Sequence, residues 1–268
     1  MPFAGESEIP SPDSILSHCY GALLPMFTIK EATVLRQLCR EFQEAVAEFP
    51  WEDDQTVIKG SVASWRACFP RARWANVRQA YRERRTTPLM DADFVHFVGL
   101  RRLDMSCCRS ITDAAFVHLK GIHTLNMWGC NQPTITDAAF IHLRGIHTLK
   151  MSCCDQSTIT DAAFAHLKGI HTLKMAFCWQ STITDAAFVH LKGIHNLSLY
   201  GYEQLTSAVF THLKGIKRLN IGNCPQLNLT DDFLKGIEWL GMCNRSQAQV
   251  DTAKSLGYPV DQKLWGGV

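Results

Sequence analysis

Eleven cysteines and eleven histidines give this chain of 268 residues enough thiols and imidazoles for metal binding or nucleophilic catalysis. Zinc sites need ligands at short spacings such as Cys-x-x-Cys, and the cysteine pairs that begin at Cys107 and Cys153 are directly adjacent instead. The sequence has neither a Gly-x-x-x-x-Gly-Lys-Ser/Thr phosphate loop nor a Gly-x-Ser-x-Gly nucleophile motif. No cysteine is singled out beside an oriented base. We therefore expect no enzyme activity, no cofactor and no metal site.

Most of the cysteines instead mark one position of a repeat. Aspartate recurs every 22 or 24 residues, with one serine substitution, at Asp91, Asp113, Asp137, Asp161, Asp185, Ser207 and Asp231. Each unit carries Ile-x-x-Leu-x-Met-x-x-Cys or a variant of it, starting at Leu100, Ile122, Ile146, Ile170, Ile194 and Ile216. A free cysteine is a small buried hydrophobe, so packing explains one thiol per repeat. Reduced thiols and an acidic N-terminus unlike a signal peptide predict a cytoplasmic or nuclear protein.

This spacing resembles the leucine-rich repeat. The Leu-x-Met core predicts a short strand, and "TDAAFVHL" predicts a returning helix whose N-caps are Thr112, Thr136, Thr160 and Thr184. We expect an α/β solenoid with a curved parallel sheet inside and helices outside; a repetitive α/β protein of another kind is the alternative. Cysteine followed by "ITD" further resembles the cysteine-containing leucine-rich-repeat subfamily, which is common in F-box proteins.

The two ends of the solenoid differ from its middle, as terminal repeats should. At the first end, Ala72, Ala75 and Val77 match the strand register weakly. At the other end, "SQAQVDTAKSLGYPV" predicts a capping helix that stops at Gly257 and Pro259. The predicted organisation is a tail (1–8), an F-box-like helical segment (9–51), a linker with a capping repeat (52–90), the repeats (91–245) and a C-terminal cap (246–268).

The first fifty residues predict two helices. The first begins with Ser11 as N-cap and Pro12 behind it. The second opens with a Thr28–Glu31 capping box and continues to Pro50 with apolar residues at helical spacing. Two such helices can serve simply as a cap on the solenoid.

The sequence of these helices also resembles the F-box, with Ile-Pro at the start, Leu-Cys-Arg-x-Phe in the second helix and Trp51 at the end. This resemblance covers Ile9 to Trp51 and implies a small α-helical segment ahead of the solenoid. It further implies a substrate-recognition subunit that binds a Skp-type linker protein and the cullin ligase core. The residues that would contact the linker are Pro10, Ile15, Leu16, Leu24, Leu35, Leu38, Cys39 and Phe42.

The repeats agree where packing dictates the residue and differ just after the first strand leucine. Alternation along a strand sends the differing side chains to the concave face and to the loops beside it. We expect an unidentified target protein to bind there, because aromatic residues in such places suit binding hot spots. Neutral drift on a solvated face is the alternative. The candidate target-binding residues are Arg102, Asp104, Asn126, Trp128, Lys150, Lys174, Phe177, Trp179, Tyr200 and Asn220.

A further column of histidines runs along the strands, bounded by Arg101 and Lys217. It contains His123, His147, His171 and His195. Such a column could form a metal ladder or a groove for an acidic target, but solvated copies of one residue explain it more simply because metal sites need convergent ligands. The formal net charge of +2 gives no argument for nucleic acid, and no apolar run is long enough to span a membrane.

Overall fold

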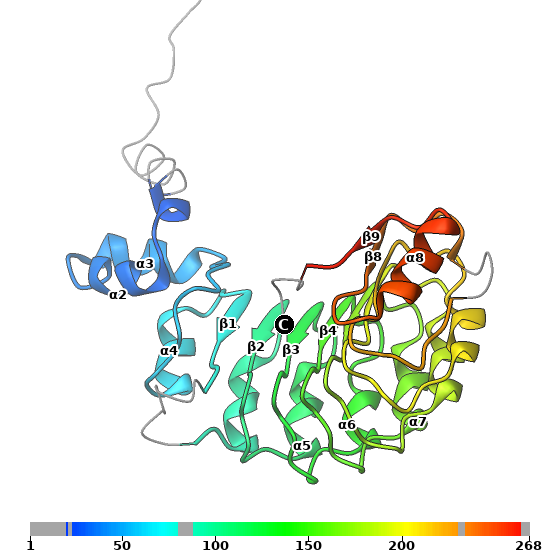
Figure 1. Ribbon diagram of the computed structural model, residues 1–268. Helices are drawn as coiled ribbons and strands as arrows, with labels where there is room; N and C mark the ends of the chain where they lie inside the picture. The colour runs from blue at the N-terminus through cyan, green and yellow to red at the C-terminus, as the bar shows by residue number, and fades with distance from the viewer. Residues whose placement is uncertain (1–19, 21–22, 80–87, 230–233, 264–268) are drawn as a thin grey trace, which may run out of the picture.

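The central leucine of each repeat lies in the middle of a three-residue strand. The strands line the inner side of the curved solenoid, and the helices lie on its outer side (Figure 1). In this computed structural model the described residues are 20, 23–79, 88–229 and 234–263. Nine parallel strands form one open sheet in chain order. They are β1 (Trp74–Asn76), β2 (Arg102–Asp104), β3 (Thr124–Asn126), β4 (Thr148–Lys150), β5 (Thr172–Lys174), β6 (Asn196–Ser198), β7 (Arg218–Asn220), β8 (Trp239–Gly241) and β9 (Val260–Asp261).

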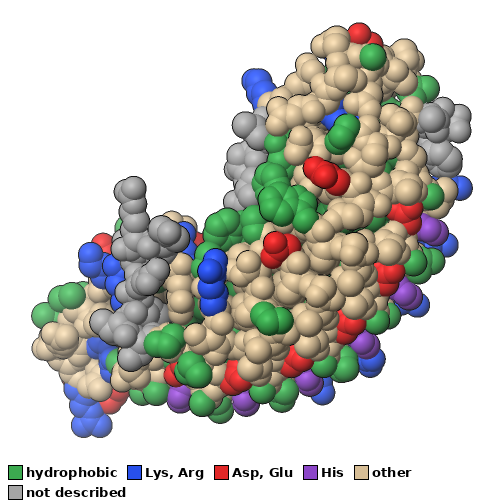
Figure 2. Space-filling model, turned by 60° about the horizontal axis from the view of Figure 1, so that its bottom comes forward, with side chains coloured by type: hydrophobic (Ala, Val, Ile, Leu, Met, Phe, Trp, Pro, Cys, Tyr) green, Lys and Arg blue, Asp and Glu red, His purple; other side chains and the backbone are tan. Residues whose placement is uncertain are grey.

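The returning segments are short helices, and α5, α6, α7, η5 and η6 each begin directly after a threonine. They are η2 (Asp91–Phe97), α5 (Asp113–Phe116), η3 (Val117–Leu119), α6 (Asp137–Ile141), α7 (Asp161–Phe164), η4 (Ala165–Leu167), η5 (Asp185–Leu191) and η6 (Ser207–His212). The four predicted N-caps are confirmed, since each hydroxyl accepts the N–H two residues on. Glycines such as Gly121, with φ +83°, follow the helical turns in a conformation that favours glycine. Figure 2 shows acidic, histidine and basic side chains recurring along the outer curve.

The repeats are linked by hydrogen bonds that the threonine of one repeat donates to the aspartate of the repeat before it. Asp113 accepts from the backbone N–H of Thr136 at 2.8 Å and from its hydroxyl at 2.7 Å. The same pair of bonds links Asp91 to Thr112, Asp137 to Thr160, Asp161 to Thr184 and Asp185 to Thr206. Each aspartate therefore favours its own helix N-terminus and also anchors the cap of the next repeat.

The cysteine column fills the core. The Cys154 thiol donates to the carbonyl of Met127 in the preceding repeat at 3.1 Å, and Cys178 bonds Met151 in the same way. Burial raises the pKa of Cys178 to about 12. The ten cysteines that the structure describes are all free thiols. The column is therefore structural, as the repeat pattern predicts.

The N-terminal segment has one more break than the sequence predicts. The Thr28–Glu31 capping box is confirmed, but α2 (Ile29–Leu35) ends early and α3 (Arg40–Glu48) begins after an extended Cys39. The prediction of a single helix up to Pro50 was therefore wrong. Apolar residues at helical spacing do not require one continuous helix, because a bend between two helices can preserve the spacing. Before them lies η1 (Leu24–Met26), and after them α4 (Val62–Cys68).

The sheet is extended by irregular chain at its first end and by a short strand at its last. The buried Trp51 accepts the N–H of Arg73 with its carbonyl at 2.8 Å, just as Arg73 accepts that of Arg101 at 2.7 Å in the next unit. The weak register at Ala75 is confirmed, because this residue pairs with Leu103. At the far end, the predicted helix is present as α8 (Gln247–Ser255), and β9 continues the sheet after it. One core runs through the helices and the solenoid. None of the described helices is long and apolar enough to cross a membrane.

Candidate functional site

The concave face is a lattice of side chains set by the strand period of two. The residues directly before and directly after each buried leucine point away from the core. The residue three positions after the leucine does so as well. We call these positions face positions. They form three rows across the repeats. The first row runs Arg102, Thr124, Thr148, Thr172, Asn196, Arg218 and Trp239; the second runs Asp104, Asn126, Lys150, Lys174, Ser198, Asn220 and Gly241; the third runs Ser106, Trp128, Ser152, Ala176, Tyr200, Gly222 and Cys243.

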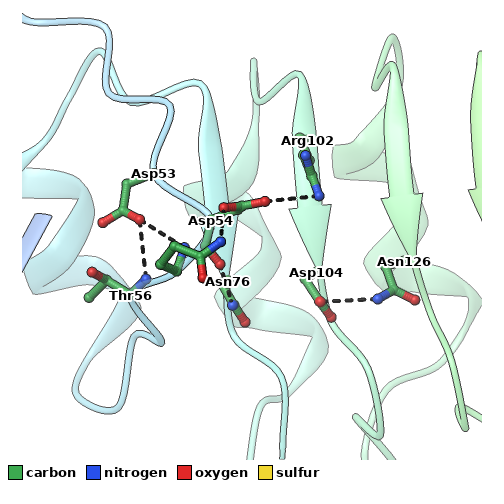
Figure 3. A network of polar contacts seen from close by, with 8 residues as sticks. Asp53, Asp54, Thr56, Asn76, Arg102, Asp104 and Asn126 are labelled. Atoms are coloured by element: carbon green, nitrogen blue, oxygen red, sulfur yellow. Dashed lines mark hydrogen bonds and ion pairs between the residues drawn. The ribbon is translucent and has the colours of Figure 1, made fainter. Parts of the chain in front are cut away.

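At the N-terminal end of this face, three predicted target-binding residues are held by polar contacts within the protein (Figure 3). Arg102 pairs with Asp54 at 3.0 Å and lies over the ring of Trp74. Asp104 accepts from the side-chain amide of Asn126 at 3.0 Å. These contacts link β2 and β3 to the segment that follows Trp51 and so stabilise this junction. The three side chains are partly used within the protein, and only their exposed atoms can contact a partner.

Two lysines occupy the centre of the face. Lys150 and Lys174 are register partners on β4 and β5, and both are half-buried. Burial lowers the pKa of Lys174, and the neighbouring Lys150 lowers it further. No face position of β3 to β6 carries an acidic residue. The centre of the face is therefore a local concentration of positive charge with hydroxyl and amide groups around it.

Aromatic side chains gather along the loop edge of the same face. Trp179 is 57% exposed and Trp128 is 38% exposed. The Phe177 ring meets the rings of Tyr200 and Trp179 edge-on, with centroids 5.0 Å and 6.0 Å away. The indole N–H of Trp179 donates to the carbonyl of Gly201 at 3.0 Å, which fixes the ring. Phe177 and Tyr200 belong to a small apolar cluster distinct from the main core. We call Trp128, Phe177 and Trp179 the aromatic edge.

The backbone at this edge is unusual. Cys107, Cys153 and Phe177 have φ values of 60°, 58° and 55°, in the left-handed region that side chains other than those of Asn and Asp rarely adopt. Equivalent positions in other repeats carry residues suited to it, Gly129, Gly201, Asn223 and Asn244. The loop geometry is thus imposed by the repeat, and three copies place a larger side chain there at a cost in local strain.

Two predicted target-binding residues need correction. Asn220 is 5% exposed, and its side-chain oxygen Oδ1 accepts the backbone N–H of Gly222 at 3.0 Å. Tyr200 is 8% exposed, and its hydroxyl accepts from Asn244 at 2.9 Å. Both side chains are used inside the protein, because the neighbouring repeats cover them. They support the surface rather than forming it.

The histidine column is a stack of rings. Ring centroids of His123, His147, His171 and His195 are 4.5, 4.5 and 4.4 Å apart, with interplanar angles of 19°, 13° and 16°. Nitrogen lone pairs lie in the ring planes, so near-parallel rings do not converge on one ion. Within the described part of the chain, no group of three or more His, Cys, Asp or Glu residues could hold a metal ion.

The N-terminal candidate residues fall into two groups. Leu24 is buried, while Leu35 and Phe42 are half-buried, Phe42 against Tyr20 at a centroid distance of 5.0 Å. Leu38 and Cys39 are exposed, Leu38 to 65%. The sequence reading missed Val34, which is 61% exposed four residues before Leu38; helical spacing was the available signal. Pro10, Ile15 and Leu16 lie outside the described residues, as does the helix expected after Ser11.

Comparison with known proteins gives the fold but no close relative. No protein-family model matches the chain, and no curated protein matches it. The TLR13–ssRNA13 complex aligns with TM-score 0.54 and 19% identity, over 69% of this chain and 26% of that one. The Toll–Spatzle complex of Drosophila aligns with TM-score 0.55 and 12% identity, over 76% and 31%. The yeast Rad7–Elc1 complex gives 17% identity over 56% and 43%, and its TM-score of 0.45 is too low to argue from.

The chain thus spans less than half the length of each of these matched chains. Its fold is an α/β leucine-rich-repeat solenoid, with a single open parallel sheet and helices on the opposite side.

Proposed function

We propose that the protein is a non-catalytic adaptor of a cullin-RING ubiquitin ligase. Its N-terminal helices dock on a Skp-type linker protein, and the concave face of the solenoid holds a target protein. Such a subunit performs no chemistry; it raises the local concentration of target lysines near the ubiquitin-charged enzyme. The linker protein is named as the partner because the N-terminal segment resembles the F-box.

The observation that carries the proposal is the division of apolar residues in the N-terminal helices. One set, Ile29, Ala32 and Val46, is buried against the core that continues into the solenoid. A second set, Val34 and Leu38, faces solvent. A cap needs only the first set, because its task is to cover the end of the solenoid. Large exposed apolar side chains at the end of α2 and in the turn that follows it support a surface that a partner covers.

The concave face supports the second half of the proposal. Its face positions differ between repeats whose buried positions are nearly the same, and the aromatic edge offers rigid apolar surface beside polar positions. Central apolar anchors within polar surroundings are the usual composition of a protein–protein hot spot.

A second candidate function is a leucine-rich scaffold in which the N-terminal helices act only as a cap. The observation in its favour is the continuity of the core through Trp51. The indole N–H of Trp51 donates to the carbonyl of Val46 at 2.8 Å, and its backbone carbonyl extends the ladder of the sheet. This candidate predicts no binding to a ligase linker.

The test is binding of the full-length protein to a purified eukaryotic Skp-type linker, measured by calorimetry. The variant Val34→Asp/Leu38→Asp should lose binding and keep the wild-type melting temperature. The matched control is Val117→Asp/Ile141→Asp, which changes two exposed apolar residues on the helical side and should bind normally. A well-folded wild type that does not bind the linker would overturn the adaptor proposal and favour the scaffold.

A further inference from the structure

We propose that one edge of the solenoid docks on the surface of an anionic lipid bilayer. This edge consists of the turns that join each helix to the following strand, and we call it the basic edge. Its cations contact the lipid phosphates, and a neighbouring row of exposed aliphatic side chains enters the headgroup layer. The inference goes beyond the proposed function and does not depend on it. A contact of this kind needs no segment that spans the membrane.

The first argument is a row of cations in consecutive repeats. Each turn glycine before the strands β3 to β8 follows an exposed lysine or arginine. The row contains Lys120, Arg144, Lys168, Lys192, Lys214 and Lys235. Within the described part of the chain, none of these six side chains is in an ion pair. The Nε–H of Arg144 donates to the Nδ1 of His166 at 3.3 Å, which leaves the charge of Arg144 without a carboxylate.

A second row of the same turns is also basic. Backbone hydrogen bonds connect its members, which are Arg73, Arg101, His123, His147, His171, His195, Lys217 and Glu238. Only the ends of this row are paired, Arg73 with Glu52 at 3.4 Å and Lys217 with Glu238 at 3.2 Å. The aspartates of the repeats lie at the other end of the helices, where they accept from threonine. The two ends of the helices thus carry opposite charge, which the net charge of +2 does not reveal.

The second argument is a row of exposed aliphatic side chains beside the cations. Val117, Ile141 and Val189 are each about half exposed. Each lies three residues before a cation of the basic edge, and residues three apart are neighbours on a helical turn. In the first repeat, the exposed Val95 and Val98 occupy the two positions. A lysine that only favoured the negative end of its helix would need no aliphatic neighbour.

This combination matches the chemistry of an anionic bilayer surface. Clusters of roughly four to eight lysines and arginines bind anionic headgroups, and each cation adds to the attraction. Aliphatic side chains gain free energy when they leave water for the boundary between headgroups and acyl chains. Lysine can serve both purposes, because its stem lies along apolar surface while its ammonium group reaches a phosphate. The two rows together therefore fit a lipid surface.

A nucleic acid fits the basic edge less well. Single strands stack their bases on aromatic rings, but His147 and His171 each have both ring faces covered by neighbours in the stack. A duplex is stiff, whereas the repeats follow an arc (Figure 1), so a straight duplex would meet only a few of the cations. Phosphates also offer nothing apolar to Val117 and Ile141. We therefore commit to a lipid surface.

The experiment measures co-sedimentation of the full-length protein with vesicles. One set of vesicles contains phosphatidylcholine alone, and the other contains about one third phosphatidylserine. We expect binding to be at least about tenfold tighter on the anionic vesicles. Salt at about 0.5 M should remove most of this difference, because it screens exposed charges. Oligouridylate at equal phosphate concentration is the comparison polyanion, and its binding is measured by anisotropy.

The decisive variant is Lys168→Gln/Lys192→Gln, which should weaken binding to anionic vesicles by about tenfold or more. The matched control is Arg109→Gln/Lys254→Gln, which removes the same charge from exposed positions outside the basic edge and should change binding by less than about twofold. Because all four side chains are exposed, both variants should keep the wild-type melting temperature.

A further variant, Val117→Ser/Ile141→Ser, keeps the charge and tests the aliphatic row. It should weaken vesicle binding by about threefold or more and leave the binding of oligouridylate unchanged.

Four results would overturn the inference: equal binding to neutral and anionic vesicles, equal loss in the two charge variants, no loss of vesicle binding in the aliphatic variant, or tighter lysine-dependent binding of oligouridylate than of anionic vesicles. Binding to the Skp-type linker is measured on the same samples. Linker binding without vesicle binding rejects this inference alone, whereas vesicle binding without linker binding rejects the adaptor and keeps the basic edge as a lipid-binding surface.

Discussion

The repeats and the N-terminal helices treat their apolar residues differently. In the repeats the pattern residues are buried in every described copy, as with Leu125, Met127 and Cys130. In the N-terminal segment Val46 of α3 is buried, while Val34 of α2 and Leu38 of the following turn are exposed. A repeat has a neighbour on each side to cover its faces, whereas the terminal helices have the solenoid on one side only. Repetition therefore completes a core by itself, and an end unit keeps a face that only another molecule can cover.

The polar contacts differ in the same way. The helix caps of the repeats are anchored by the aspartate of the previous unit, as Asp137 anchors Thr160. The cap of α2 combines local bonds between Thr28 and Glu31 with one bond from another segment, since the N–H of Ile29 donates to Asp53 at 2.8 Å. Neighbouring repeats thus stabilise each other through paired aspartate–threonine bonds, whereas the start of α2 receives a single bond from outside its own turn, from Asp53.

The largest expected difference between the two regions concerns apolar truncation. Phe164→Ala removes a fully buried ring from α7 and should lower the free energy of unfolding by about 3–5 kcal/mol. Leu38→Ala should change it by less than about 0.5 kcal/mol, because the side chain is mostly exposed. Urea unfolding followed by circular dichroism measures both. Similar losses in the two variants would mean that Leu38 is buried in the free protein.

The next largest effect concerns the ties between repeats. Asp137→Ala leaves two donors of Thr160 without their acceptor and should cost about 1–3 kcal/mol. Glu31→Ala, its counterpart in the N-terminal cap, should cost less because its bonds are exposed and local. Thermal unfolding of the two variants tests this order. A larger loss for Glu31→Ala would contradict the view that the bonds between repeats are worth more than the local capping box of α2.

A smaller effect should follow from the strained loops. The five described non-glycine residues with positive φ all lie in the repeats, and none lies in the N-terminal helices. Cys153→Asn puts a tolerant residue at φ 58° and should raise the free energy of unfolding by about 0.5–1 kcal/mol. Cys39→Asn, at a helix start with negative φ, carries no such relief. Unfolding midpoints in urea would show the difference, and destabilisation of Cys153→Asn would mean that thiol packing outweighs strain.

The smallest effect should be the pH dependence. Burial lowers the pKa of His123 and His171 below 6.5, and the neighbouring His147 adds to the lowering for both residues. The unfolded chain therefore takes up protons before the folded chain, so stability present above pH 6.5 is lost as pH falls through the folded pKa. Melting temperatures from pH 7.5 to 5 should fall slightly, and less in His147→Gln. A fall of equal size in that variant would place the cause outside the stack.

The N-terminal helices should respond in a lower pH range. Burial raises the pKa of Asp53, but hydrogen bonds from Thr56, Ile29 and Gln55 outweigh it, and the net pKa is below 3.8. Its stabilisation is present above pH 3.8 and is lost as pH falls through its folded pKa. The two regions therefore have separate pH windows, histidine first and carboxylate second, and a pH series on Asp53→Asn distinguishes them.

Periodicity determined much of this protein without any structure. The repeat fixed the strands, the threonine caps, the cysteine column and even the weak first strand at Ala75, because each position is buried or bonded in the same way in every copy. The aspartate–threonine ties could also have been found, since both residues recur at the same positions in most copies, with Ser207 in place of the aspartate in one. The linker-binding role of the N-terminal residues stays a prediction, as does the target-binding role of the concave face.

Only the tertiary structure decided which residues at the face positions are exposed and which are buried. Asn220 lies in the same row of face positions as Lys150 and Lys174, yet it is buried. On the next strand, the Trp239 ring lies over Gly241, beside the Asn220 side chain. The bend at Cys39 likewise leaves the apolar spacing intact while splitting the helix. Sequence fixes the direction of a side chain through local geometry, whereas its exposure depends on which neighbour covers it, and that neighbour is set by the packing of the whole chain.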